Sequence, residues 1–229
     1  MIVTAIVVAA GSGKRLGSKV HKPLVKVAGL PLVIHCLKAL DAYDGIKDIV
    51  LVVNAANRAA LLSAVKHYRI SKVSSVVLGG ARRQDSVWRG LKAVTSDADF
   101  VLIHDAGRPF INRKILSAVI KEAARTGAAI AAVPVKDTIK EVVRGQTFVK
   151  KTLDRDRLWE VQTPQVFKRE IILEAYNKFD GKTVTDDAAL VERLGKKVSL
   201  VMAAYSNIKV TTPEDLIIAE AIANRILVL

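Results

Sequence analysis

The sequence predicts a doubly wound α/β fold, in which a mostly parallel β-sheet carries helices on both faces. Short apolar runs alternate with amphipathic helical patterns. Several of these runs are continuously apolar, as strands are when helices cover both faces of their sheet. The length of 229 residues suits one such domain with a modest insertion. We therefore expect residues 1–229 to form a single Rossmann-like nucleotide-binding domain.

The expected elements alternate regularly as far as residue 135. Strands are expected, where the apolar runs are short, at residues 4–10, 48–54, 73–80, 99–106 and 128–135. Helices are expected, where apolar residues recur at helical spacing, at residues 31–43, 57–68, 84–94 and 113–127. Two helices at 168–179 and 186–195 and a strand at 197–205 follow. A last helix is expected to begin with Thr212 as its N-cap and Pro213 in its first turn.

The alternation breaks between about Lys136 and Thr163. The segment "KDTIKEVVRGQTFVKKTLDRDRLW" has polar-apolar strand patterns on either side of the turn "RGQ", as a β-hairpin does. A two-stranded hairpin is marginally stable by itself. We therefore expect residues of about 136–163 to project as a dimerisation arm that packs on a second copy of the chain in a homodimer.

The composition favours a small anionic partner over nucleic acid. The 36 Lys and Arg residues exceed the 22 Asp and Glu residues and give a net charge of +14, which attracts anions. The cations are spread along the chain and aromatic residues make up 5% of it, so the sequence offers no stacking platform for single strands. A polyphosphate substrate fits this pattern better.

A cytoplasmic protein without a membrane anchor is expected. No apolar stretch approaches the roughly 20 residues that span a bilayer, and no basic segment precedes the first apolar run. Cys36 is the single cysteine and cannot form an intramolecular disulfide, which suits a reducing compartment. We expect its thiol to be a small buried hydrophobic group on a helix face.

The first strand leads into the loop "VVAAGSGKRLG", residues 7–17, which contains close glycines and two cations. It is not a Walker-type loop, because Val8 and Arg15 stand where that motif has Gly and Ser or Thr. It is not a dinucleotide fingerprint either, because Leu16 replaces the third glycine. Small residues after a buried strand still let backbone N–H groups approach an anion. Both a phosphate site and a plain strand-to-helix turn are compatible with this loop.

Further motifs make the loop more specific. It is followed by "HKPL" and "GLPLVIHCLKAL", as in nucleotidyltransferases that activate sugar or alcohol phosphates. The chain then contains, in order, "GGARRQDSVWRGL", "VLIHDAGRP", "PVKDTIKEV", "LDRDRLWEVQTPQVF", "TDDAALVERLG" and "NIKVTTPEDL". Over nearly its whole length it resembles the 2-C-methyl-D-erythritol 4-phosphate cytidylyltransferase family of non-mevalonate isoprenoid synthesis.

The resemblance implies a reaction. The enzyme would transfer a cytidylyl group from CTP to 2-C-methyl-D-erythritol 4-phosphate, giving 4-diphosphocytidyl-2-C-methyl-D-erythritol and pyrophosphate, with Mg²⁺ or another divalent cation as cofactor. The nucleophile is then a phosphate oxygen, which is largely ionised at pH 7 because its second pKa is about 6. Such a reaction needs in-line positioning and cations and does not need a general base.

The resemblance also implies roles for individual residues. The implied catalytic cations are Arg15, Lys22, Arg155 and Lys209. The implied nucleotide-binding residues are Ala9, Ala10, Gly11, Ser12, Gly13, Arg15, Lys22, Gly80, Ser86, Asp105, Ala106 and Lys209. The implied ligands of the alcohol phosphate are Asp105, Arg108, Thr138, Arg155 and Thr163, of which Thr138 and Arg155 would serve the neighbouring subunit. Asp105 is also the implied metal ligand.

Some of these positions have structural alternatives. Asp105 follows a strand and so lies at its carboxyl end, where ligands bind in open α/β sheets. A turn interaction with Arg108 is the alternative. His104 is expected to be a packed strand residue. Asp186 and Asp187 are expected to serve the start of a helix, since acids favour the positive end of a helix dipole.

The segment "GGARRQDS" combines two expectations. By resemblance, Gly79 and Gly80 permit close backbone approach to the nucleotide, and Ser86 contacts the cytosine base. The same segment precedes a helical pattern, for which Asp85 or Ser86 is the expected N-cap.

Two positions depart from the family pattern. Residues 21–23, His-Lys-Pro, stand where the family usually has Pro-Lys-Gln, so the lysine is kept and contacts of the glutamine are in question. Gly107 replaces a commoner alanine and is expected to loosen the turn that follows Asp105.

Two other functions are compatible with the sequence. A ribitol 5-phosphate cytidylyltransferase would share the glycine loop, an Asp-Ala-x-Arg-Pro-like turn and "NIKVTTP", whereas "DRDRLWEVQTPQVF" and "TDDAALVERLG" favour methylerythritol phosphate. A nucleic-acid-binding protein that kept the fold and lost catalysis would account for the charge of +14. Active enzyme is favoured by the presence of Arg15, Lys22, Asp105, Arg155 and Lys209.

Overall fold

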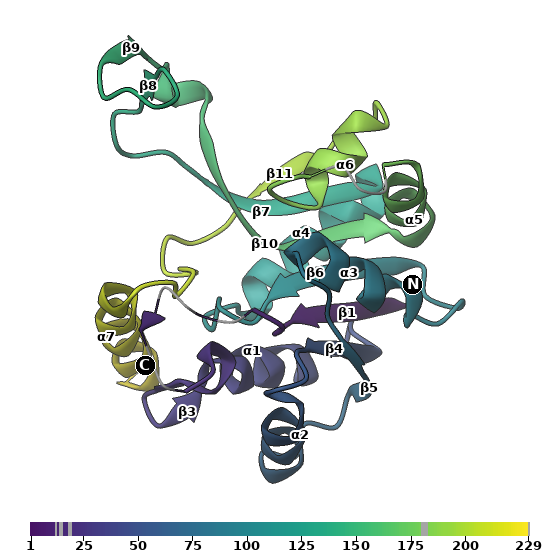
Figure 1. Ribbon diagram of the computed structural model, residues 1–229. Coiled ribbons are helices and arrows are strands. Elements are labelled where there is room, and N and C mark those ends of the chain that lie inside the picture. The colour runs from purple at the N-terminus through teal and green to yellow at the C-terminus, as the bar shows by residue number, and fades with distance from the viewer. Residues whose placement is uncertain (12, 14–15, 18–19, 180–182, 229) are drawn as a thin grey trace.

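A seven-stranded sheet forms the centre of the molecule (Figure 1). The computed structural model describes residues 1–11, 13, 16–17, 20–179 and 183–228. The strands of the sheet are β1 Val3–Val8, β4 Asp48–Val53, β5 Val73–Leu78, β6 Phe100–Asp105, β7 Ala128–Pro134, β10 Trp159–Lys168 and β11 Ser199–Met202. Their order is β11-β7-β10-β6-β1-β4-β5, and all neighbours run parallel except β10, which is antiparallel to β6 and β7. The doubly wound, mostly parallel sheet expected from the sequence is confirmed.

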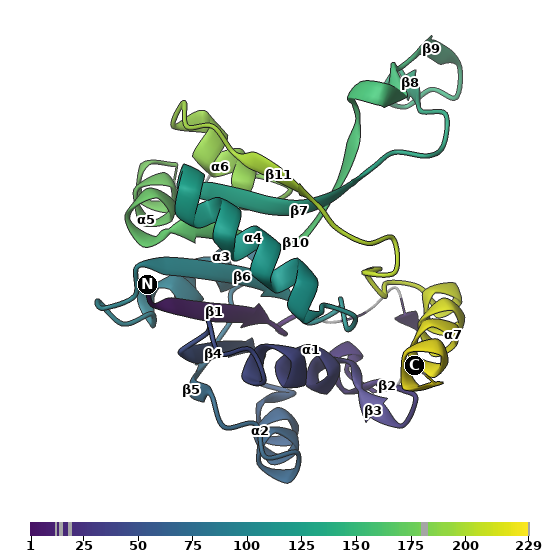
Figure 2. The ribbon, with the colours of Figure 1, turned by 180° about the vertical axis from the view of Figure 1, so that it is seen from behind.

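Helices pack on both faces of this sheet (Figures 1 and 2). One face carries α1 Leu32–Asp41, α2 Arg58–His67 and α4 Arg113–Thr126. The other carries α3 Arg83–Lys92, α5 Arg169–Lys178 and α6 Ala188–Arg193. In β1, Ala5 and Val7 pack in the first layer and Ile6 packs in the second, because successive strand side chains point to opposite faces. The continuous apolar run of β1 is thereby buried on both sides.

The last helix, α7 Pro213–Val228, packs beside the small hairpin of β2 Lys26–Val27 and β3 Leu30–Pro31. The backbone N–H of Asp215 donates to Thr212 Oγ1 at 3.4 Å, and the N–H of Thr212 donates to the Asp215 carboxylate at 2.9 Å. This reciprocal pair is a capping box. The expected N-cap at Thr212 is confirmed.

Strand β10 was not expected from the sequence. It lies between β6 and β7, and its polar side chains Gln162, Thr163 and Gln165 are buried. Its pairing with β7 shifts register between Val161 and Gln165, around Pro164. A proline has no N–H for a ladder and is tolerated in a sheet at such irregularities. The apolar pattern that predicts a buried strand is interrupted here by polar residues and a proline, so the strand could not be predicted from the sequence.

A hairpin of β8 Lys140–Val142 and β9 Val149–Thr152 stands out from the body of the molecule (Figures 1 and 2). The expected arm of 136–163 is therefore too long at its end, because the chain rejoins the central sheet at Trp159. Four apolar side chains of the hairpin are exposed: Val142, Val143, Phe148 and Val149. The body of the protein does not cover this apolar surface.

Cys36 lies fully buried in α1, as expected. Burial raises the pKa of its thiol to about 12, so the group is an uncharged core atom at neutral pH. Among the described residues, no helix is both long enough and apolar enough to cross a bilayer.

Candidate active site

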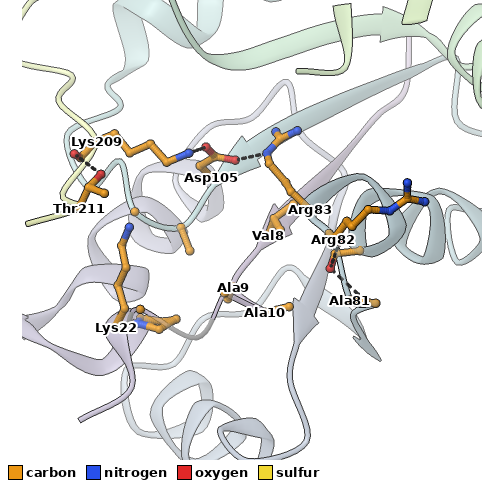
Figure 3. A pocket seen from close by; sticks show the side chains of 17 residues that line it. Val8, Ala9, Ala10, Lys22, Ala81, Arg82, Arg83, Asp105, Lys209 and Thr211 are labelled. Atoms are coloured by element: carbon orange, nitrogen blue, oxygen red, sulfur yellow. Dashed lines mark hydrogen bonds and ion pairs between the residues drawn. The ribbon is translucent and has the colours of Figure 1, made fainter. Parts of the chain in front are cut away.

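A cavity of about 510 Å³ lies at the carboxyl ends of β1 and β6 (Figure 3). Open α/β sheets bind ligands at this edge. Its lining includes, of the site residues implied by the sequence, Ala9, Ala10, Gly11, Gly13, Lys22, Gly80, Ser86, Asp105, Ala106 and Lys209. Ser12 and Arg15 lie outside the described residues. The structure thus brings together segments that are up to 200 positions apart in the chain.

A second cavity, of about 410 Å³, is lined by Arg108 and Thr163 and by side chains of β10 and β11. Arg83, Asp105 and Lys209 line both cavities. We call these three residues the ion triad. The ion triad is therefore part of the wall that the two cavities share.

Asp105 is the centre of the ion triad (Figure 3). Its Oδ1 accepts a hydrogen bond from Arg83 Nε at 2.8 Å, and its Oδ2 accepts one from Lys209 Nζ at 2.6 Å. Burial by itself would raise the pKa of Asp105, but the charges of Arg83 and Lys209 hold this pKa well below its ordinary range. The carboxylate is ionised throughout the physiological pH range.

The turn interaction of Arg108 with Asp105, named above as the structural alternative, is present in the backbone, where the Arg108 N–H donates to the Asp105 carbonyl oxygen at 3.0 Å. The Arg108 side chain makes its hydrogen bonds elsewhere. Its guanidinium donates to the carbonyl oxygens of Asn207 at 2.7 Å and Val161 at 3.3 Å. Burial lowers the pKa of Arg108 from its ordinary value. The residue joins β10 to the segment that carries Lys209 and presents its cation to the second cavity.

The sequence does not single out Arg83, because "GGARRQDS" contains two adjacent arginines. The structure separates their roles. Arg82 is the N-cap of α3 and pairs with Asp85 at 2.6 Å, so the expected N-cap at Asp85 or Ser86 is wrong. Arg83 turns to the ion triad, where Asp187 and Asp105 raise its pKa above the ordinary value despite its burial.

Asp187 does not serve the start of α6 through its side chain. Its Oδ2 accepts from Arg83 Nη1 at 2.8 Å and its Oδ1 accepts from the Tyr176 hydroxyl at 2.6 Å. Asp186 does serve the helix start, because its Oδ1 accepts from the backbone N–H of Ala189 at 3.2 Å. The pair of acids therefore divides between helix capping and the support of Arg83.

Thr163 holds Asp105 from the neighbouring strand. Its Oγ1 accepts from the backbone N–H of Asp105 at 3.1 Å and lies 3.1 Å from His104 Nδ1. His104 Nε2 donates to the Arg108 carbonyl at 3.0 Å, which leaves Nδ1 to accept from the Thr163 hydroxyl. Burial lowers the pKa of His104 to about 4, so the ring is neutral. His104 is confirmed as a packed strand residue.

The two glycines after β5 make room for neighbouring residues of the same chain. A Cβ on Gly79 would lie 2.5 Å from the Cβ of Ala10, and a Cβ on Gly80 would overlap that of Asp85. The backbone N–H of Gly80 donates to Ser86 Oγ at 3.1 Å. This loop can therefore pack closely beside the glycine loop and complete the floor of the first cavity.

Gly107 leaves space for the end of the Lys22 side chain. A Cβ on Gly107 would lie 2.8 Å from Lys22 Nζ and 3.0 Å from its Cε. The Gly107 carbonyl also accepts from the backbone N–H of Val210 at 2.8 Å. The missing methyl group thus leaves room for Lys22, a cation of the first cavity. The expected loosening of the turn stays a prediction.

Gly107→Ala is expected to lower kcat about tenfold and to leave the melting temperature nearly unchanged. The methyl group displaces the flexible end of Lys22 and leaves the packed backbone in place. Steady-state kinetics and thermal denaturation test this. In a Lys22→Ala background the glycine substitution should have no further effect on kcat. An equal loss in both backgrounds would show that Gly107 acts otherwise.

Thr138 and Arg155 lie in the arm and line neither cavity of this chain. Thr138 precedes β8, and Arg155 begins the short 3-10 helix Arg155–Arg157. The Arg155 guanidinium donates to the Lys136 carbonyl at 2.9 Å, so it is held at the base of the arm. Among the described residues, these are the predicted site residues that the fold does not bring to the ion triad.

The described lining residues of the two cavities include several cations and neither histidine nor cysteine. This fold and this site define a protein of the nucleotidyltransferase class. The family model IspD, 2-C-methyl-D-erythritol 4-phosphate cytidylyltransferase, matches residues 3–225. The chain belongs to the 2-C-methyl-D-erythritol 4-phosphate cytidylyltransferase family.

Relatives and solved structures agree with this family. The 2-C-methyl-D-erythritol 4-phosphate cytidylyltransferase of Shouchella clausii is 47% identical over 98% of both chains, and that of Geobacillus thermodenitrificans is 48% identical over 97% of both. The crystal structure of 4-diphosphocytidyl-2C-methyl-D-erythritol synthase from Anaerococcus prevotii superposes with a TM-score of 0.86 at 32% identity, covering 98% of this chain and 96% of that one. The Thermus thermophilus cytidylyltransferase gives a TM-score of 0.78 at 32% identity, covering 98% and 100%.

Proposed function

We propose that this protein transfers the cytidylyl group of CTP to 2-C-methyl-D-erythritol 4-phosphate, releasing pyrophosphate. The observation that carries the proposal is the pair of adjoining cavities that share the ion triad. The first contains the glycine-loop backbone and Lys22 and suits a nucleoside triphosphate. The second contains Arg108 and suits a smaller phosphate. The reacting atoms would then meet at Asp105 and Lys209.

Electrostatics is the main obstacle to this reaction. A phosphate oxygen with negative charge attacks the α-phosphorus of a triphosphate, and the bond from that phosphorus to the β-phosphate oxygen breaks. Because the nucleophile is already ionised, no side chain has to remove a proton. The protein has to hold two anions in line and neutralise the charge that develops between them. Lys22 and Lys209 are suitably located in the first cavity for that task.

In this mechanism Lys209 exchanges its ion-pair partner Asp105 for a substrate phosphate. Its side chain is 40% exposed, and its ammonium pairs with Asp105 Oδ2. A phosphate at the wall between the cavities would compete for this ammonium and draw it away from Asp105. Arg15, implied as a further cation by the family resemblance, would meet the same phosphate from the glycine loop. Lys22 starts beside Gly13 of the same loop and brings its ammonium next to Gly107.

The first cavity suits a divalent cation whose ligands are supplied partly by the protein and partly by the nucleotide phosphates. Among the described residues no cluster of three or more His, Cys, Asp or Glu side chains could hold a metal. Mg²⁺ is commonly held by one or two carboxylates together with substrate phosphates, and Asp105 is the carboxylate that the described lining of this cavity offers. When bound, Mg²⁺ would neutralise charge on the phosphates and favour pyrophosphate as a leaving group.

Pyrophosphate release from CTP and Mg²⁺ tests the proposal. We expect turnover with 2-C-methyl-D-erythritol 4-phosphate. Turnover with ribitol 5-phosphate but not with 2-C-methyl-D-erythritol 4-phosphate would show that the acceptor is ribitol 5-phosphate. Salt-sensitive RNA or DNA binding at sub-micromolar affinity, without turnover of either alcohol phosphate, would instead support a binding protein with the same fold.

The arm is proposed to complete the second cavity of a partner subunit in a homodimer. Thr138 and Arg155 line neither cavity of their own chain, and they flank a hairpin that stands out from the body with Phe148 and Val149 exposed (Figures 1 and 2). A second copy would cover these apolar side chains and receive the Arg155 guanidinium, which is suited to a phosphate. Each active site would then contain residues of two chains.

Mixing two inactive variants is expected to restore activity. Lys22→Ala disables the chain's own cavity, and Arg155→Ala disables the arm that it donates. Random pairing in a homodimer gives about one quarter of wild-type activity, because half the dimers are mixed and each has one intact site. Variants co-expressed in equal amounts and assayed without selection of the mixed dimers test this, with Arg144→Ala as a matched arm control. Full activity of a monomer in light scattering, or no restoration, would contradict a shared site.

A further inference from the structure

Arg83 joins two carboxylates. Its Nε donates to Asp105 Oδ1 at 2.8 Å and its Nη1 donates to Asp187 Oδ2 at 2.8 Å. The other oxygen of Asp187 accepts from the Tyr176 hydroxyl at 2.6 Å. An unbroken chain of charged and hydrogen-bonded groups therefore runs from α5 to the wall between the two cavities. We call the four residues Tyr176, Asp187, Arg83 and Asp105 the relay.

Tyr176, the residue of the relay farthest from Asp105, contacts the helix that carries Arg83. The Tyr176 ring stacks on the ring of Trp88 in α3, with centroids 5.6 Å apart and an angle of 12° between the planes. Arg83 is the first residue of the same α3. From Arg83, the contacts with Asp187 and Tyr176 therefore lead back to Trp88 of the same helix. The Arg83 guanidinium is restrained by these contacts and is less free to follow a ligand than the end of an unpaired side chain.

Burial of the charged Asp187 side chain costs free energy, and this side chain does not cap α6. Its side chain is completely inaccessible to solvent, and removing a carboxylate from water costs several kcal/mol before pairing. The Gln165 side-chain oxygen already accepts from the backbone N–H groups of Asp187 and Ala188 at 3.2 Å. Among the described residues, the Asp187 carboxylate accepts side-chain hydrogen bonds from Tyr176 and Arg83, so its charge serves the guanidinium.

The two oxygens of Asp105 therefore have unequal partners. Oδ1 is bound by Arg83, whose side chain is 27% exposed and is also bound by Asp187. Oδ2 is bound by Lys209, whose side chain is more exposed. We propose that Arg83 is a positioning residue, fixed by Asp187, that keeps Asp105 in place while Lys209 exchanges Asp105 for a substrate phosphate. This inference rests on the proposed function, because it concerns the same transfer between two phosphates.

Asp187→Asn tests the relay, because it keeps the shape of the side chain and removes its charge. We expect kcat to fall about tenfold, while the Kd of CTP measured calorimetrically without the acceptor changes less than about twofold. The control is Val191→Ala, which weakens the packing of α6 from a fully buried position without touching the relay. It should lower the melting temperature and leave kcat unchanged. If Asp187→Asn does not fold, Tyr176→Phe decides, with an expected loss in kcat of about threefold.

A double-mutant cycle separates positioning from a direct contact. Arg83→Lys places a point charge that cannot hold two carboxylates as a planar guanidinium does. If both residues act through the position of Asp105, the double variant should be no slower than the slower single variant. Additive losses, or a loss in Asp187→Asn that tracks stability as in Val191→Ala, would overturn the inference. Wild-type pyrophosphate release in the same assay shows whether the proposed function itself holds.

Discussion

We expect Lys22→Ala to lower kcat by about a thousandfold and to raise the KM for CTP by less than about tenfold. Lys22 lines the first cavity, and its ammonium lies in the space left open by Gly107. A cation at this position acts on charge that increases as the α-phosphate is attacked, so its loss weakens the transition state more than the ground state. Single-turnover and steady-state kinetics measure the two quantities separately.

A matched control is available in the next strand. Lys26 is an exposed lysine of β2 that lines neither cavity, and Lys26→Ala should leave kcat unchanged. Lys22→Arg should restore activity only in part, because a planar fork replaces a compact point charge. If Lys22→Ala changed KM alone, Lys22 would be a residue of ground-state binding and the proposed role would be wrong.

Asp105→Asn is expected to lower kcat at least about a hundredfold and the free energy of unfolding by about 2 kcal/mol. Without the carboxylate charge, the Arg83 and Lys209 cations lose their common partner and repel each other. The nucleotide site loses its proposed metal ligand at the same time. Urea denaturation and steady-state kinetics with varied Mg²⁺ concentration measure both effects.

The pH dependence of stability gives a second test of Asp105. The folded protein holds the pKa of this carboxyl below that of the unfolded chain, which is about 3.9. Its contribution to stability is therefore present above about pH 4 and is lost as the pH falls below that value. The Asp105→Asn variant should lose less stability on acidification than the wild type.

A surface ion pair provides the control for Asp105. Asp97 pairs with Lys47, and both side chains are about half exposed. Asp97→Asn should cost less than about 1 kcal/mol and leave kcat unchanged, since exposed pairs contribute little. Equal costs of the Asp97 and Asp105 substitutions would show that the ion triad is no more than a surface salt bridge.

Elements with a periodic apolar pattern could be predicted from the sequence. The strand before the glycine loop and the strand that ends at Asp105 are continuous apolar runs, and both form inside the sheet as expected. Because parallel strands present their carboxyl ends at one edge, the position of Asp105 in the chain already implies its place beside the glycine loop. Local pattern was sufficient for these features.

Strand β10 shows where local pattern fails. It contains Gln162, Thr163 and Gln165, whose side chains are satisfied by groups from other segments. A polar residue is compatible with a buried strand only when such partners exist, and partners from distant segments are invisible along the chain. The arm was therefore drawn five residues too far into the sheet, to Thr163, although its hairpin was correctly expected.

The sequence by itself determined the doubly wound fold, the family and the glycine loop with its cations, because these depend on periodicity and on motif order. Only the tertiary structure decided which charges meet. Arg82 and Arg83 are adjacent and alike in the chain, yet the first pairs with Asp85 in the first turn of α3 and the second joins Asp105 to Asp187. Ion pairing depends on separations of a few ångströms between segments about 20 and 100 positions apart. Those separations exist only after the sheet and its helices have packed.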